Sequence, residues 1–190
     1  MHATRLTLVC HARTQAQKRG RFALDESLDM DWQAAVLSEV GRFKRAPRVL
    51  CGPELRAWQT ALMFTEHPQV EPLLRECDFG RWQGQALDDI QQAEPAALND
   101  WLCDSRAAPH GGESVGQLCE RVGRWLHSLE PLPGHVVAVT HPFVIRAALL
   151  HALQCAPAMF GSIDIEPLSS VELRFNGRWR LRLEASIGRG

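Results

Sequence analysis

The sequence contains no tyrosine, no pair of cysteines spaced CxxC and no apolar run that could span a membrane. A membrane-spanning helix needs about 20 consecutive apolar residues. The N-terminal apolar stretch, LTLVC, is also too short for the core of a signal peptide. We therefore expect a cytoplasmic protein with no membrane partner. The spacing of the six cysteines fits neither a zinc site nor the disulfide framework of a secreted protein, so we expect reduced thiols and no metal.

An excess of charge of either sign is also missing, because 21 basic and 22 acidic residues give a net charge of -1. A dedicated nucleic-acid-binding protein carries a basic footprint, so we expect no nucleic-acid partner. The chain of 190 residues has no internal repeat and no Pro/Gly-rich linker, and 45% of its residues are apolar. These features predict a single domain over residues 1–190 with a sizeable core. Nothing in the sequence indicates an oligomeric state.

Short leucine-rich or β-branched runs alternate with segments in which apolar residues recur at helical spacing. Pro53 and Pro142 stand where the first residue of a helix is expected, and Ser114 with Gln117 matches a capping box. The predicted strands are 5–10, 48–51 and 135–140, with a short extended piece near Val70. The predicted helices are 32–44, 55–64, one after Ser114, one after Pro142, and one or two short ones in 86–103 broken at Pro95; residues 15–31 and 73–85 are expected to be irregular.

The C-terminal segment predicts a β-hairpin. Apolar and charged residues alternate in VELRF and RWRLRLE, and Asn176-Gly177 between them is typical of a two-residue type I′ turn. We interpret the arginine row as the solvated outer face of an edge hairpin rather than as a phosphate or nucleic-acid patch. Together these elements predict an α/β fold: a three-layer α/β/α sandwich with a largely parallel mixed sheet and a C-terminal β-hairpin.

Chemically active side chains follow the three predicted strands. His11 and Arg13 come directly after the first strand, and Arg56 lies in the first turn of the helix behind the second. His141 follows the third strand. Ligands of such sheets bind at the carboxyl ends of the strands, and free N–H groups at helix N-termini favour an anion. The sequence therefore predicts an anion site at this edge of the sheet.

Three other chemistries compete with the anion site. A metal could bind the two histidines, but no third His, Asp or Glu stands at ligand spacing beside either one. The G-x-S-x-G elbow of serine hydrolases is missing. A thiol nucleophile at Cys10 stays open, although adjacent residues of a strand point to opposite faces, so Cys10 and His11 would not easily share a pocket.

The chain resembles the histidine phosphatase superfamily, also called phosphoglycerate mutase-like, from residue 5 to about residue 150. Five segments carry the resemblance in the expected order and approximate spacing: LVCHART, CGPELRAWQTA, LLRECDFGRWQG, HGGES and VTHPFVIRAAL. The size and motif layout are similar to those of the short bacterial phosphatases of this superfamily. The resemblance implies phosphatase activity; mutase activity is less expected, because 190 residues leave no room for the insertions of true mutases.

The resemblance also implies the roles of four residues. His11 would be the nucleophile that becomes phosphorylated, and Arg56 would bind the phosphoryl group. Glu76 would give a proton to the leaving oxygen, and His141 would complete the phosphate pocket. Such a site needs no metal and no organic cofactor, since a neutral imidazole can attack phosphorus while an arginine neutralises the phosphoryl oxygens.

The sequence departs from the superfamily pattern at three positions. Cys10 stands where the pattern has an arginine, Ala12 where it has a glycine, and the second motif reads CGP where the pattern usually has S-S-P. Loss of a charge-assisted hydrogen bond to phosphate reduces the interaction free energy by about 1.5–3 kcal/mol. Three nearby residues could compensate for the missing guanidinium: Arg13, Arg19 and Arg21.

The resemblance further implies that Arg13 and Thr14 bind substrate and that segment 86–110 forms a substrate cap. We expect hydrolysis of a small organic phosphomonoester, with an α-ribazole-phosphate-like molecule as one substrate, through a phosphohistidine intermediate. The alternative is a catalytically impaired relative that binds a phosphorylated ligand or a partner protein. Cys10 is the main support for that alternative.

Overall fold

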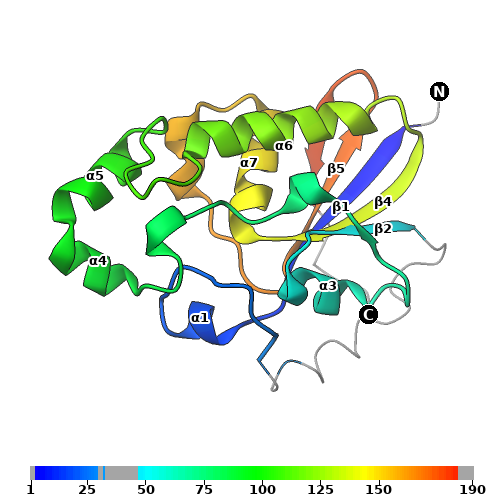
Figure 1. The fold of residues 1–190 in the computed structure, drawn as a ribbon. Helices are drawn as coiled ribbons and strands as arrows, with labels where there is room; N and C mark the ends of the chain where they lie inside the picture. Colours follow the sequence, from blue (N-terminus) through cyan, green and yellow to red (C-terminus); the bar gives the residue numbers. More distant parts are fainter. Residues whose placement is uncertain (1–2, 30–31, 33–46, 184–190) are drawn as a thin grey trace, which may run out of the picture.

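The computed structural model describes residues 3–29, 32 and 47–183. Within this part of the chain, six strands form one mixed sheet in the order β3-β2-β4-β1-β5-β6 (Figure 1). Strands β1 to β4 pair in parallel, whereas β5 and β6 run antiparallel to their neighbours. The strands are β1 (Thr4–Cys10), β2 (Arg48–Cys51), β3 (Gln69–Val70), β4 (Gly134–Thr140), β5 (Ser170–Phe175) and β6 (Trp179–Arg182). The predicted strands are confirmed.

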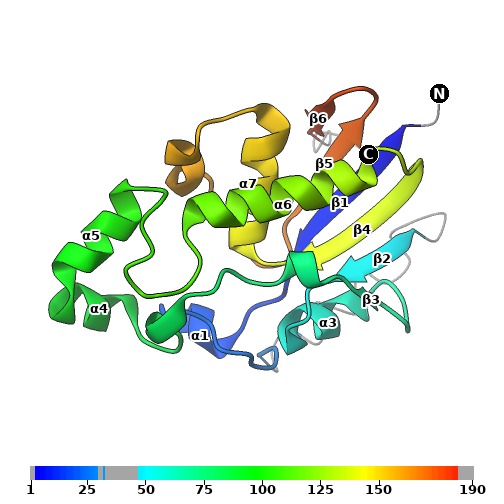
Figure 2. The ribbon, with the colours of Figure 1, turned by 45° about the horizontal axis from the view of Figure 1, so that its top comes forward.

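Helices lie on both faces of the sheet (Figures 1 and 2). The long helices α6 and α7 cover one face and α3 lies on the other, so the predicted three-layer α/β fold is confirmed. The helices are α1 (Gln15–Lys18), α3 (Leu55–Ala61), α4 (Leu87–Ala93), α5 (Pro95–Cys103), α6 (Val115–Leu129) and α7 (Pro142–Leu153). Three short 3₁₀ helices are η2 (Pro72–Leu74), η3 (Gly80–Trp82) and η4 (Pro157–Ser162). Apart from Trp32, the predicted helix 32–44 lies outside the described residues.

Side chains that alternate along the strands divide the core between these two faces. Leu6 and Leu8 of β1 belong to a large buried cluster with the apolar stripes of α6 and α7. Val9 of β1, with Val49 of β2, belongs to a second buried cluster that includes Ala61 of α3. Burial on both faces is what a mainly parallel sheet requires. Among the described residues, no helix is long and apolar enough to cross a membrane.

Local signals set several helix ends. Ser114 caps α6 as predicted, accepting from Gln117 N while the Gln117 side chain accepts from Ser114 N. Pro95 separates α4 from α5, and Pro142 opens α7. Pro53 does not begin its helix, because Glu54 is the N-cap of α3. The expectation of an irregular segment after residue 15 also misses the single turn α1, which is too short to leave a periodic pattern.

The C-terminal hairpin forms at the edge of the sheet, as predicted, and its arginines Arg174, Arg178, Arg180 and Arg182 are exposed, but its turn differs from the prediction. Phe175 pairs with Trp179, so three residues connect the strands, and within this loop only Gly177 has a positive φ. A type I′ turn requires positive φ at two residues. Glu172 of β5 is nevertheless buried, at 4% exposed. Its carboxylate pairs with three arginines: Arg5, Arg174 and Arg182.

Candidate active site

Parallel pairing brings the two predicted histidines together. Cys10 of β1 is in register with Thr140 of β4, so the residues that follow them, His11 and His141, leave the sheet side by side. Their ring centroids lie 5.1 Å apart. Both side chains are at most 1% exposed, as is that of Arg56 in the first turn of α3. The carboxyl end of the sheet therefore holds a buried polar cluster, as predicted.

His11 is held in the form that a nucleophile needs. Its Nδ1 lies 2.7 Å from the carbonyl oxygen of Ala12, to which it donates a hydrogen bond. The lone pair of Nε2 then faces Arg56 Nε, which donates to it over 3.3 Å. Burial, together with the nearby charges of His141 and Arg56, lowers the pKa of His11 well below its usual value. The imidazole is therefore neutral, and its Nε2 can attack an electrophile.

Arg56 supplies the guanidinium of the cluster. Besides His11, it donates to the carbonyl oxygen of Leu24 over 2.8 Å and lies 3.4 Å from Glu76 Oε2. The neighbouring Asp25 accepts from the backbone N–H of Leu55, which ties this stretch of chain to the start of α3. Segment 24–25 therefore lies against the arginine, and each of the three guanidinium nitrogens donates one hydrogen bond to a protein group.

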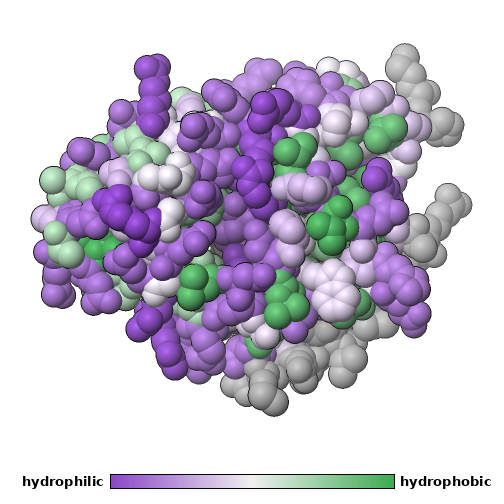
Figure 3. All heavy atoms as spheres, viewed as in Figure 1, coloured by the Kyte–Doolittle hydropathy of each residue, from purple (hydrophilic) through white to green (hydrophobic). Residues whose placement is uncertain are grey.

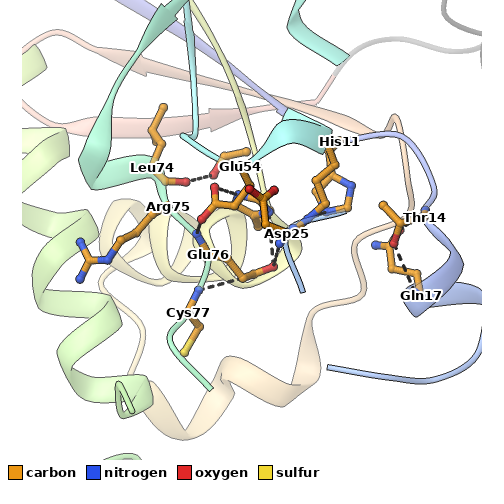
Figure 4. Close-up of polar contacts among 12 residues, drawn as sticks. His11, Thr14, Gln17, Asp25, Glu54, Leu74, Arg75, Glu76 and Cys77 are labelled. Carbon is orange, nitrogen blue, oxygen red and sulfur yellow. Dashed lines mark hydrogen bonds and ion pairs between the residues drawn. The ribbon is translucent and has the colours of Figure 1, made fainter. Parts of the chain in front are cut away.

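Glu76 reaches the cluster from the irregular segment between η2 and η3. Its Oε1 accepts from the backbone N–H of Cys77, and its Oε2 lies 3.3 Å from His141 Nδ1. The side chain is 12% exposed, so it is the most open of the four predicted catalytic groups. Figure 4 shows Glu76 and Glu54 side by side at the centre of the site, with His11 to one side. The structure thus brings all four predicted catalytic residues together.

Glu54 is a member of the site that the sequence analysis missed. One carboxylate oxygen lies 2.7 Å from His141 Nε2, and the other accepts from the backbone N–H of Glu76 over 2.9 Å. Although burial raises the pKa of Glu54, the hydrogen bond and charge of His141 and the N–H of Glu76 lower it to about 2. The group is therefore ionised. The sequence feature that could have indicated Glu54 is its position two residues before Arg56, the predicted phosphate-binding arginine.

Gly52 makes room for this contact. A Cβ at position 52 would lie 2.8 Å from the carbonyl oxygen of Leu74 and 3.0 Å from both Glu54 Oε2 and His141 Nε2. Any larger side chain would have to displace the pair. The glycine of the CGP motif is therefore the residue that lets Glu54 reach His141.

Arg121 is the second residue that the sequence analysis missed, and it positions the segment that carries Glu76. Its side chain is buried in α6 and forms two hydrogen bonds, of 2.8 and 2.7 Å, to the carboxylate of Glu113. It also donates to the carbonyl oxygens of Leu73 and Arg75. Because Arg121 lies on the apolar face of an amphipathic helix, only its charge at a core position could have indicated this role.

The HGGES motif completes the support of the Glu76 segment. The backbone N–H of Glu113 donates to the carbonyl oxygen of Asp78 over 2.7 Å. A Cβ on Gly112 would lie 2.0 Å from that same oxygen, so only glycine permits this approach. The motif therefore acts through its backbone and through Glu113, which binds Arg121.

The predicted substrate-binding residues Arg13 and Thr14 contact other groups. The Arg13 guanidinium lies over the Trp32 ring, 5.3 Å from its centroid. Thr14 is buried and caps α1 in a capping box with Gln17, a pair that Figure 4 shows apart from the central cluster. Their roles in binding substrate stay predictions.

Cys10 is poorly suited to act as a thiol nucleophile. It is fully buried, and burial together with the charge of Glu76 raises the pKa of its thiol. A buried thiol of raised pKa carries little thiolate, which is the nucleophilic form. The neutral imidazole of His11 is the better nucleophile of the two.

The sequence showed no third metal ligand beside the two histidines, but the folded structure places one near them. Nitrogens of His11 and His141 and an oxygen of Glu76 all lie within 4.8 Å of one another, close enough to reach one ion. Sequence spacing could not show this, because the three residues come from separate elements. However, Arg56 places a positive charge 3.3 Å from His11 Nε2, which opposes a cation at that nitrogen. The donor set therefore suits a phosphoryl group better than a metal.

Large hollows on the surface do not coincide with this cluster. One of about 1510 Å³ lies between α6, α7 and β6, and one of about 410 Å³ lies beside Arg75, Asp78 and Arg121. The face that displays α6 is mainly hydrophilic, with hydrophobic side chains scattered over it (Figure 3). We assign the chemistry to the buried cluster, because the nucleophile, the guanidinium and the carboxylates meet only there among the described residues.

Comparisons with known proteins show the family of this chain. The family model described as histidine phosphatase superfamily (branch 1) matches residues 6–185. A curated relative, glucosyl-3-phosphoglycerate phosphatase of Mycolicibacterium vanbaalenii, is 32% identical over 137 residues, which are 68% of this chain and 61% of that protein. Further curated relatives match over 54% of their length, so the chain spans little more than half of the first relatives it matches.

Solved structures show the same fold. The native structure of a mycobacterial glucosyl-3-phosphoglycerate phosphatase is 27% identical, with a TM-score of 0.82 over 94% of this chain and 97% of that one. The α-ribazole phosphatase of Shigella flexneri has a TM-score of 0.80 over 94% of this chain and 95% of that one. Because it is only 20% identical, that likeness extends to the fold alone.

Proposed function

The chain belongs to the histidine phosphatase superfamily (branch 1), and we propose that it hydrolyses a small organic phosphomonoester through a phosphohistidine intermediate. The observation that carries the proposal is the state of His11. Its Nδ1–H is bound to a backbone carbonyl and its neutral Nε2 lies beside Arg56, which is the arrangement for attack on a phosphoryl group.

In the first step, the lone pair of His11 Nε2 forms a bond to phosphorus while the bond from phosphorus to the leaving oxygen breaks. Glu76, in its protonated form, gives its proton to that oxygen and becomes a carboxylate. Arg56 turns from the Leu24 carbonyl to the phosphoryl oxygens and balances their charge. The products of this step are the free alcohol and phosphohistidine.

In the second step, water attacks phosphorus as Glu76 takes up one of its protons, and the N–P electron pair returns to His11. Inorganic phosphate leaves, and both groups regain their starting forms. His141, within 3.3 Å of Glu76, faces the same reaction centre.

We further propose that the substrate is a sugar-like or similarly polar phosphate ester. The relative at 32% identity is named for glucosyl-3-phosphoglycerate, whereas likeness to the α-ribazole phosphatase is one of fold. Segment 86–110, with α4 and α5, stands at one end of the molecule (Figure 2) and is the proposed substrate cap. The partner of this protein is thus a small-molecule phosphate ester.

Trapping the intermediate tests this proposal. A ³²P-labelled phosphate ester should leave acid-labile, base-stable label on His11, and His11→Ala should abolish both label and turnover. His67→Ala, which removes an exposed histidine, is the matched control and should keep both. Label on Cys10, or full activity in His11→Ala, would contradict the mechanism.

A second candidate, a binding protein without turnover, is favoured by one observation: Cys10 stands where the superfamily usually has a phosphate-binding arginine. Calorimetry with vanadate and turnover of an aryl phosphate separate the two. Binding with no turnover, revived by Cys10→Arg, would support the second candidate. Turnover that vanadate inhibits in the unaltered protein would support the phosphatase.

A further inference from the structure

Glu54 uses both of its oxygens within the site. Oε2 is 2.7 Å from His141 Nε2, and Oε1 accepts from the backbone N–H of Glu76. It is the N-cap residue of α3, yet its side chain caps none of the N–H groups of that helix. Gly52 leaves the space that the pair occupies. The carboxylate therefore joins the chain before α3 to the two groups that face the leaving oxygen.

This contact determines where His141 carries its proton. Glu54 is ionised, so at 2.7 Å it accepts a hydrogen bond, and Nε2 must be the donor. The other nitrogen, Nδ1, is buried without a well-aligned hydrogen-bond partner among the described residues and lies 3.3 Å from Glu76 Oε2. If neither atom carried a proton, two lone pairs would face each other. A proton on either atom removes that repulsion.

We propose that Glu54 is a positioning residue that holds the proton of His141 on Nε2 and thereby keeps a second proton between His141 Nδ1 and Glu76. This inference rests on the proposed phosphatase function. As the bond from phosphorus to the leaving oxygen breaks, the shared proton passes through Glu76 to that oxygen, and Glu76 is left as a carboxylate. The Nε2 proton stays on the hydrogen bond to Glu54 throughout.

Several groups of the described residues act on this proton, and one of them is Arg146, whose positive charge interacts with Glu76 and opposes the proton. Arg56 lies 3.4 Å from Glu76 Oε2 and opposes the proton, whereas ionised Glu54 favours it from the far side of the imidazole. His11, the other group in contact, is neutral. Without Glu54, His141 is free to carry its only proton on Nδ1 and to donate it to an ionised Glu76, which then has no proton to give.

A purely structural role for Glu54 predicts a different outcome. Loss of the proton would matter only where the leaving oxygen needs protonation, which is the case for alkyl phosphates and much less so for an activated aryl phosphate. Loss of an anchor for the Glu76 segment would also displace the Glu76 carboxyl and could give the same dependence on the leaving group. The position of the proton on the His141 ring, which displacement of the Glu76 backbone alone would leave unchanged, therefore separates the two roles.

The test compares Glu54→Ala and Glu54→Gln on p-nitrophenyl phosphate and glycerol 2-phosphate. General acid catalysis contributes about 10²–10⁴-fold, so Glu54→Ala should lower kcat on the alkyl ester at least about tenfold more than on the aryl ester. Glu54→Gln keeps an oxygen acceptor for Nε2–H and should show a smaller difference. Glu66→Gln, which removes the same charge from an exposed position, should behave like the parent. Equal losses on both esters would overturn the proposal.

A second readout does not depend on turnover. In ¹⁵N-edited NMR spectra, the His141 ring should show a protonated Nε2 in the parent protein and should lose that fixed proton in Glu54→Ala. An unchanged ring signal in the folded variant would overturn the proposal. If the parent protein turns over neither ester, the proposed function fails, while the ring signal still decides whether Glu54 holds this proton.

Discussion

At the scale of single residues, position 10 alters the charge of the site more than any other departure from the superfamily pattern. Replacement of an arginine by cysteine leaves Arg56 as the guanidinium in contact with His11, and Glu54 adds a carboxylate nearby. Arg13, one of the residues expected to compensate, lies over Trp32 instead. In the proposed reaction, the site would therefore neutralise a phosphoryl group with fewer fixed positive charges and would depend more heavily on the protons of its histidine and carboxyl groups.

The buried thiols give a direct check on the identity of the nucleophile. We expect iodoacetamide at about pH 8 to modify Cys103 and Cys155 within minutes, because both thiols are exposed to the reagent. Cys10 and Cys77 are buried, with raised pKa values caused first by burial and next by Glu76. They should stay unmodified until the protein unfolds. Peptide mass spectrometry measures this, and rapid alkylation of Cys10 in the folded protein would reopen the thiol alternative.

At the scale of elements, the sequence predicted what short-range rules determine and missed what long-range contacts determine. The capping box at Ser114 and the break at Pro95 depend on neighbours within a few positions, and both are confirmed. Glu54 was not predicted as a site residue, because its partner His141 is 87 positions away in the sequence. The hairpin turn differs by one residue because only Gly177 takes positive φ.

Arg121 connects helix α6 to the segment that carries Glu76, and its contribution to stability can be tested. Arg121→Met would leave buried Glu113 with only the exposed Arg75, 3.7 Å away, as its partner, and removal of one member of a buried ion pair costs about 3–5 kcal/mol. The free energy of unfolding, measured with urea, should fall by about that amount.

Arg124→Met is the matched control, because Arg124 is exposed on the same helix and such surface changes usually stay within about 0.5 kcal/mol. Activity at a temperature where Arg121→Met remains folded should also fall, since Glu76 loses its support. Equal stability of the two variants would contradict the role given to Arg121.

At the scale of the whole molecule, the sheet order explains why distant segments form one site. Strands β1, β4 and β2 are neighbours, so the residues that follow each of them meet at one edge. The polar groups gathered there and along β4 are held in fixed protonation states within a buried environment. Such groups link the stability of the entire fold to pH.

Acid should therefore destabilise this protein, with a sign that the pKa shifts determine. Burial, with the charge of Arg5, lowers the pKa of His135 to about 4, and burial is also the largest cause of the lowered pKa values of three other histidines: His11, His110 and His151. A histidine with a folded pKa below its unfolded value binds a proton more readily when unfolded. Its stabilising contribution is complete above about pH 6.5 and declines as the pH falls toward the folded pKa.

Urea unfolding at pH 7.5 and pH 5 measures the effect. A histidine that stays neutral in the folded protein at pH 5, about 1.5 pH units below its unfolded pKa, lowers the free energy of unfolding at pH 5 by about 2 kcal/mol. For the half-buried His135 the corresponding loss is about 1 kcal/mol after solvent screening. We expect the free energy of unfolding to fall by at least about 2 kcal/mol between the two pH values. His135→Gln should recover about 1 kcal/mol of that loss, whereas His67→Gln, at an exposed position, should recover none.

Ionised Glu54, with its pKa near 2, keeps its contribution throughout this range and loses it only in stronger acid. A stability that rises on acidification would mean that the buried histidines lose rather than gain protons when the chain unfolds.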